Sequence, residues 1–93
     1  MGVFPDEDGL KVRPLFGSAT VWPAADISGF TTRAVTQDST PIRLIQPCIL
    51  LTDGSEELLS GLSAYRLFPG AQRQVSAAVA RMGAWTGRPV LPA

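Results

Sequence analysis

The chain has 93 residues, 45% of them apolar and 17% charged, and its eight basic residues balance its eight acidic residues. This length fits one domain with a modest core, and a balanced charge lacks the electrostatic footprint of a nucleic-acid-binding protein, so nucleic acid is not an expected partner. One Cys and no His exclude an internal disulfide, the usual type of zinc site and catalysis of the Ser-His-Asp or Cys-His type.

Residues 1–18 predict an N-terminal arm or loop. Their one extended piece runs from Leu10 to Phe16, and Pro14 interrupts it. The run Asp6-Glu7-Asp8-Gly9 favours a solvated turn. Its carboxylates would also suit calcium, but the run does not meet the EF-hand pattern.

Four short segments are typical of strands, because β-branched and apolar residues fill them and Pro or polar turns bound them. They are Ala19 to Trp22, Phe30 to Thr36, Ile42 to Ile45 and Cys48 to Thr52. Pro47 separates the last two. Because Pro cannot donate to a ladder, we expect an edge strand, a bulge or a bend at this position.

Residues 53–68 have two interpretations. Asp53-Gly54-Ser55-Glu56 has the spacing of a capping box, and apolar residues follow at helical intervals from Leu58 to Tyr65, which predicts a helix. Alternate apolar residues between 62 and 68 are instead typical of a strand. The sequence leaves both open.

Residues 71–84 give the clearest signal, that of an amphipathic helix. Its apolar residues recur at helical spacing and are Val75, Ala78, Val79, Met82 and Trp85. Gly83 or Gly87 would suit its C-terminal cap. Residues 87–93 predict an extended, apolar C-terminal tail with two prolines.

Together these elements predict an α+β fold over a single domain, residues 1–93. It would have a small antiparallel sheet of short strands, one or two helices and extended terminal segments rich in Pro and Gly. The unbroken apolar runs are far shorter than the roughly 18–20 residues of a membrane span, and acids stand where a signal peptide needs bases. We therefore expect no signal peptide, no transmembrane segment and no membrane partner, and a protein that is cytoplasmic or within a viral particle.

Few residues suggest chemistry. Asp53, Glu56 and Glu57 could pair for acid–base work, but adjacent Glu residues point to different faces of a helix, so capping is favoured. Cys48 lies in an apolar run, which predicts a buried, inert thiol. The sequence thus predicts no enzyme, no catalytic residue, no cofactor, no metal site and no small-molecule substrate.

Charge is divided along the chain. Residues 1–57 contain all eight acids and four of the eight bases, whereas residues 58–93 contain four Arg and no acid. The two halves could neutralise each other within one monomer. Alternatively, copies could meet head to tail, or the basic half could dock on an acidic partner.

These observations favour a non-enzymatic structural or assembly protein that acts through protein–protein contacts in a larger complex, as a homo-oligomer or with other subunits. A small viral-particle component of the connector, tail or decoration type fits this description. Apolar ends stiffened by Pro lie along a neighbour at little cost in entropy. We expect contacts through the helix 71–84 and both ends, at Val3, Phe4, Arg66, Arg73, Arg81, Arg88, Val90 and Leu91.

Two other function classes stay open. One is a small ligand-binding or enzyme domain that uses Asp53, Glu56 and either Arg66 or Arg73. The other is a regulatory domain that binds nucleic acid through the four Arg of the C-terminal half, with binding that depends on salt.

Overall fold

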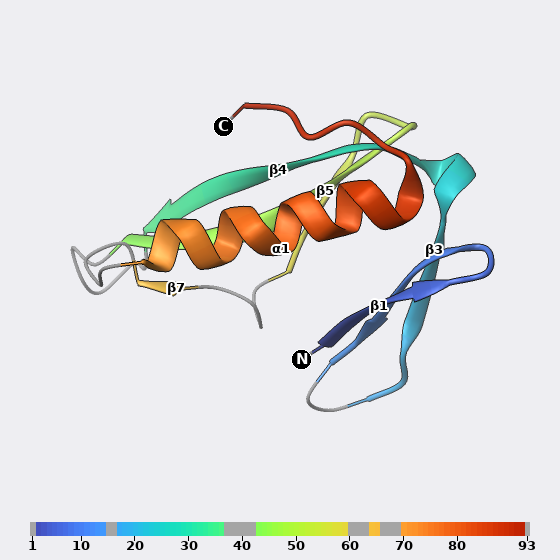
Figure 1. Ribbon diagram of the computed structural model, residues 1–93, viewed down its shortest axis with the longest axis horizontal. Helices are drawn as coiled ribbons and strands as arrows, with labels where there is room; N and C mark the ends of the chain where they lie inside the picture. The colour runs from blue at the N-terminus through green and yellow to red at the C-terminus, as the bar shows by residue number, and fades with distance from the viewer. Residues whose placement is uncertain (1, 15–16, 37–42, 60–63, 66–69, 93) are drawn as a thin grey trace.

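The computed structural model describes residues 2–14, 17–36, 43–59, 64–65 and 70–92. It shows the α+β fold that the sequence predicts, with two small antiparallel sheets and a C-terminal helix (Figure 1). The strands are β1 (Gly2–Asp6), β2 (Gly9–Arg13), β3 (Thr20–Pro23), β4 (Ile27–Thr36), β5 (Arg43–Leu51), β6 (Glu56–Leu58) and β7 (Ala64–Tyr65). A short 3-10 helix, η1 (Ala24–Asp26), joins the sheets, and the α-helix is α1 (Ala71–Thr86).

The first sheet has the order β1-β2-β3 and corrects the prediction of an arm or loop over residues 1–18. Residues 2–13 form an antiparallel hairpin, with Val3 opposite Val12 and Phe4 opposite Lys11. Leu10 and Val12 enter the core because side chains two apart on a strand share one face. We missed this hairpin because Pro5 and the acidic turn obscured the alternation of apolar and polar residues.

The second sheet is built on the long pair β4 and β5. The strand predicted at Phe30 to Thr36 is confirmed and begins earlier, at Ile27. The register shifts between Ile27 and Gly29, and this irregularity lets the chain leave η1 with Ile27 in the core.

Pro47 does not divide β5, contrary to the two separate strands that we predicted. β5 runs from Arg43 to Leu51 with Pro47 buried near its middle. β6 pairs with residues 48–50 and β7 with residues 44–45 along the same edge of β5. The Pro47 carbonyl accepts a bond from the Leu59 N–H (3.0 Å). Pro47 has no N–H to donate in return. It lies between the residues of β5 that pair with β6 and those that pair with β7, so the missing N–H leaves the ladder with β4 unaffected.

The predicted helix start at Asp53 is wrong. The Asp53 carboxylate accepts bonds from the backbone N–H and hydroxyl of Ser55, so it caps a tight turn, and β6 follows instead of a helix. Of the alternative strand over 62–68, Ala64–Tyr65 is a strand. Residues 60–63 and 66–69 lie outside the described residues.

Helix α1 confirms the clearest prediction and covers one face of the second sheet (Figure 1). Val75, Ala78, Val79 and Met82 are buried on its inner face, and Val79 and Met82 belong to a core cluster with residues of both sheets. The helix ends at Gly87, whose φ of 70° is left-handed, and the Arg88 N–H bonds the Gly83 carbonyl at 3.1 Å. Within the described ranges, no helix combines the length and apolarity that crossing a bilayer requires.

Candidate interaction surfaces

The C-terminal segment 88–92 is fixed to the free edge of β4. The Phe30 N–H donates to the Pro89 carbonyl (2.9 Å), and the Leu91 N–H donates to the Phe30 carbonyl (2.7 Å). These bonds make a short parallel bridge between Phe30 and Val90. The predicted tail is therefore extended, and its backbone is held by its own chain.

Two glycines shape the seat of this segment. A Cβ on Gly29 would lie 2.9 Å from the Pro89 carbonyl oxygen, and a Cβ on Gly83 would lie 2.9 Å from Val90 Cγ2. Real Cβ atoms essentially never approach so closely. The seat between β4 and the end of α1 thus requires the absence of both side chains.

The side chains of the C-terminal segment remain accessible. Val90 is 50% exposed and Leu91 is 45% exposed, although hydrogen bonds fix the backbone of both. Arg88 is half-buried, and its Nε donates to the Ala24 carbonyl at 2.9 Å. Two of the predicted contact residues, Val90 and Leu91, therefore stand on an ordered apolar ridge at the edge of the second sheet, from which Val90 projects toward Gly83 of α1 and Leu91 toward Gly29 on the opposite side.

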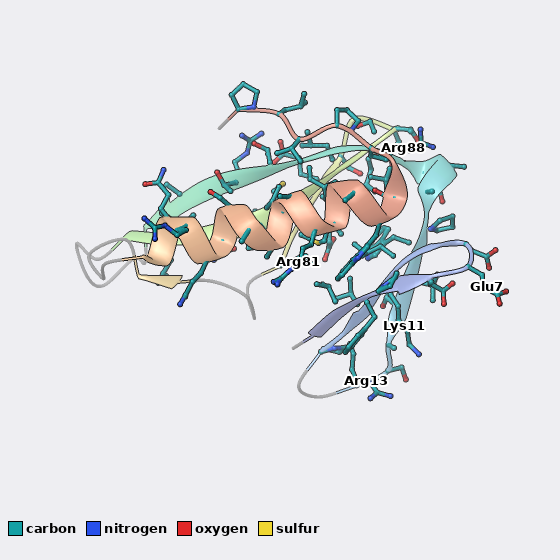
Figure 2. All side chains as sticks on the ribbon, viewed as in Figure 1. Glu7, Lys11, Arg13, Arg81 and Arg88 are labelled. Carbon is teal, nitrogen blue, oxygen red and sulfur yellow. The ribbon has the colours of Figure 1, made fainter. Side chains whose placement is uncertain are left out.

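The outer face of the first sheet is a second accessible surface. Register places Phe4, Lys11 and Val21 in one row across its three strands, and Phe4 and Val21 are 48% and 42% exposed. Lys11 and Arg13 point away from α1 (Figure 2). A shallow cavity of about 330 Å³ lies here, lined by Phe4, Pro5, Asp6, Lys11 and Arg13.

Val3 and Phe4, predicted together as contact residues, are separated by strand alternation. Val3 faces inward and packs partly buried against the core, whereas Phe4 faces outward. The structure therefore places Phe4 on an accessible surface and Val3 beneath it.

Three acidic turns meet at one end of the molecule. The Ala24 N–H bonds the Asp8 carbonyl (2.8 Å), and the Thr52 N–H bonds the Asp26 carbonyl (3.0 Å), so η1 is bonded to the β1–β2 turn and to the β5–β6 turn. A cavity of about 280 Å³ at this end is lined by Trp22, Asp26, Leu51, Thr52 and Asp53. Glu7 lies at the tip of the β1–β2 turn (Figure 2). We call this region the acidic end.

Arg73, Arg81 and Arg88, the described basic residues of the C-terminal half, do not neutralise this end through ion pairs. Among the described residues the one ion pair joins Arg33 and Glu56 (2.6 Å), both from the acidic half of the chain. Arg73 and Arg81 are exposed on α1, and Arg66 lies outside the described residues. Arg88, by contrast, bonds Ala24 of η1 and lies at the acidic end, so the charges of the two halves are only partly separated in space.

Arg33 and Glu56 cover the thiol of Cys48. The thiol is fully buried and lies 3.7 Å from Glu56 Oε2. Burial raises the pKa of Cys48, and the nearby Glu56 carboxylate raises that pKa further. The hydrogen bond and charge of Arg33 lower the pKa of Glu56. A buried, protonated thiol agrees with the predicted inert cysteine.

Of the residues proposed for an enzyme site, the structure describes Asp53, Glu56 and Arg73, and each of them has different surroundings. Asp53 bonds Ser55, whose hydrogen bonds lower the pKa of Asp53, and Glu56 bonds Arg33. Arg73 is exposed on α1 instead. In the described part of the chain, no three acidic or Cys side chains are arranged to hold a metal ion.

Sequence reasoning missed the residues that build these surfaces. The seat of the C-terminal segment, which we call the tail seat, is formed by Gly29, Gly83 and Thr31. On the first sheet, Val21 lies in the same row as Phe4. Correct pairing of the first three strands would have identified the row that contains Val21. The tail seat could not be found in this way, because Thr31 contacts a residue 60 positions further along the chain. Comparisons of the chain with family models, with curated proteins and with solved structures give no match.

Proposed function

We propose that this protein is a non-enzymatic assembly protein that acts through contacts with other protein subunits. The observation that carries the proposal is the C-terminal segment, whose backbone is bonded to β4 while Val90 and Leu91 stay about half exposed. A fixed apolar ridge loses little conformational entropy when a partner covers it.

Other accessible apolar residues support the same function. Large side chains that are 40–50% exposed occur on the first sheet, β6, α1 and the tail, and they are Phe4, Val21, Leu58, Trp85, Val90 and Leu91. Single exposed apolar residues are ordinary on a monomer. Here Phe4 and Val21 share one row across the first sheet, which suits a contact surface.

The proposal extends to homo-oligomers and to heterologous subunits. The acidic end and the exposed Arg73 and Arg81 of α1 suit contacts in which an acidic surface of one subunit meets a basic surface of the next. A component of a viral particle, of the connector, tail or decoration type, is the setting that we propose for such contacts.

Light scattering over a concentration series, at low and at high salt, tests this function. We expect a discrete oligomer for the wild-type protein and a lower mass for the double variant Val90→Asp, Leu91→Asp. Gln72→Asp adds a charge to an exposed site on α1 and serves as the control that keeps the oligomer. A wild-type monomer at every concentration that also captures no subunit from its native source would contradict the proposal.

A further inference from the structure

We propose that the outer face of the first sheet binds the same face of a second copy, around a two-fold axis. This inference rests on the proposed assembly function and names one of its partners. The face is defined by Phe4, Asp6, Lys11, Arg13 and Val21.

Charge changes sign along this face. Arg13 lies opposite Gly2 at one end, Phe4 lies opposite Lys11 in the middle, and Asp6 lies opposite Gly9 at the turn. Side chains two apart on a strand are separated by about 6.8 Å. The face therefore has a basic end at Arg13, a middle row in which Lys11 lies between two apolar side chains, and an acidic end at Asp6.

A two-fold axis that lies in the plane of this face and is perpendicular to the strands makes the face complementary to its own copy. It reverses the strand direction of the second copy, so the acidic end of each copy meets the basic end of the other. Asp6 then lies beside Arg13 of the second copy, twice in each dimer. Phe4 and Val21 of both copies fill the middle of the interface.

The charged side chains of this face are available for these contacts. One carboxylate oxygen of Asp6 accepts the Asp8 N–H at 3.1 Å, which holds Asp6 at the turn. Neither Lys11 nor Arg13 forms an ion pair with another described residue. The cavity between Phe4, Asp6 and Arg13 offers space for a partner side chain.

Lys11 distinguishes the proposed dimer from the binding of another protein to the same face. It lies in the middle row between Phe4 and Val21, close to the proposed axis, so the two copies bring like charges together. Removal of this charge should tighten the dimer. An acidic partner protein on the same face would instead lose affinity when Lys11 is replaced.

The small area of the face predicts a weak dimer. Three strands about 4.8 Å apart and five residues long give roughly 250 Å² per copy, whereas a standard interface buries about 800 Å² per partner. We therefore expect a weak dimer, with a dissociation constant of roughly 0.1–1 mM. In an assembly, several such contacts add their effects.

Sedimentation analysis of the full chain up to about 1 mM, at low salt, tests the inference. Asp6→Arg and Arg13→Asp should each weaken the dimer at least threefold, and the double variant should restore it. Lys11→Met should tighten the dimer by a similar factor. Glu57→Arg, which makes the same charge change as Asp6→Arg at an exposed site on β6, should leave it unchanged, and circular dichroism verifies the fold of each variant.

Three results would overturn the inference: a wild-type monomer up to 1 mM, a dimer insensitive to both charge reversals, or a weaker dimer for Lys11→Met. Binding of a fluorescent single-stranded oligonucleotide that Lys11→Met abolishes would also overturn it. If the protein is monomeric but still binds another subunit through Leu91, this inference fails while the proposed function stands.

Discussion

The Thr31 hydroxyl donates to the carbonyl oxygens of Leu91 (3.0 Å) and Pro92 (3.3 Å), which lie 60 residues or more along the chain. Thr31 is buried, with 1% of its surface exposed, so this contact joins the middle of β4 to the C-terminal segment. The ridge of Val90 and Leu91 thus depends on one hydroxyl, two backbone bonds and two glycines.

Replacement of Thr31 by Val should loosen the ridge. Val has nearly the same shape but no hydroxyl, so the Leu91 and Pro92 carbonyls lose a donor. We expect the free energy of unfolding to fall by about 1 kcal/mol, as measured by chemical denaturation. Hydrogen exchange at the Leu91 amide should quicken. Thr32→Val, at the next position of β4, is the control and should change that exchange little.

Gly83→Ala should destabilise the protein, although the same change inside most helices stabilises them by about 1 kcal/mol. The reason is that the new Cβ would lie 2.9 Å from Val90 Cγ2 and 3.0 Å from the Arg88 carbonyl. In a chain that ends at Gly87 these atoms are gone, and Ala should be the stabilising residue. Thermal unfolding of the full chain and of the chain that ends at Gly87, each with and without Gly83→Ala, gives the sign of the change in stability. The same sign in both chains would refute the tail seat.

Cys48 should resist thiol reagents in the folded protein. The thiol is fully buried and its raised pKa keeps it protonated, so Ellman's reagent should react stoichiometrically only after unfolding. Glu56→Ala removes a group that lies over the thiol and should accelerate labelling severalfold. Glu57→Ala, an exposed neighbour, is the matched control. Rapid labelling of the wild type would show that the thiol is accessible.

Acid should remove the contribution of the Arg33–Glu56 pair to stability. The pKa of Glu56 is lowered from an ordinary value of 4.5 because Arg33 bonds and faces its carboxylate. The contribution is present above that ordinary value and is lost as the pH falls through the lowered pKa. Unfolding curves of the wild type and Glu56→Gln should differ at neutral pH and converge once the pH falls below the lowered pKa of Glu56. Curves that stay parallel would exclude this linkage.

Local signals predicted part of the fold and failed at long range. The periodicity of α1 and the β-branched run of β4 were sufficient to identify those elements. The Asp53 turn imitates a helix start, because an Asp followed by Ser can cap either a helix or a turn. Only the pairing of β5 with β6 decides between them.

The contact surfaces show the same limit. Strand alternation indicates that Lys11 faces outward from the first sheet. Only the pairing of β1, β2 and β3 shows that Phe4 and Val21 flank Lys11 in one row. The apolar ends were predicted as contact segments from their composition. Whether Val90 would be fixed to its own chain depended on β4, which is distant in sequence.

Site-specific photo-crosslinking of the full chain in its native source tests the assembly function most directly. A benzophenone side chain is placed at Leu91 on the exposed ridge, and in a second variant at Gln72 on the exposed side of α1. We predict that light produces a discrete covalent adduct with another protein subunit at Leu91 and none at Gln72. The absence of any adduct at Leu91, in a variant that folds and is expressed normally, would contradict the function proposed for this protein.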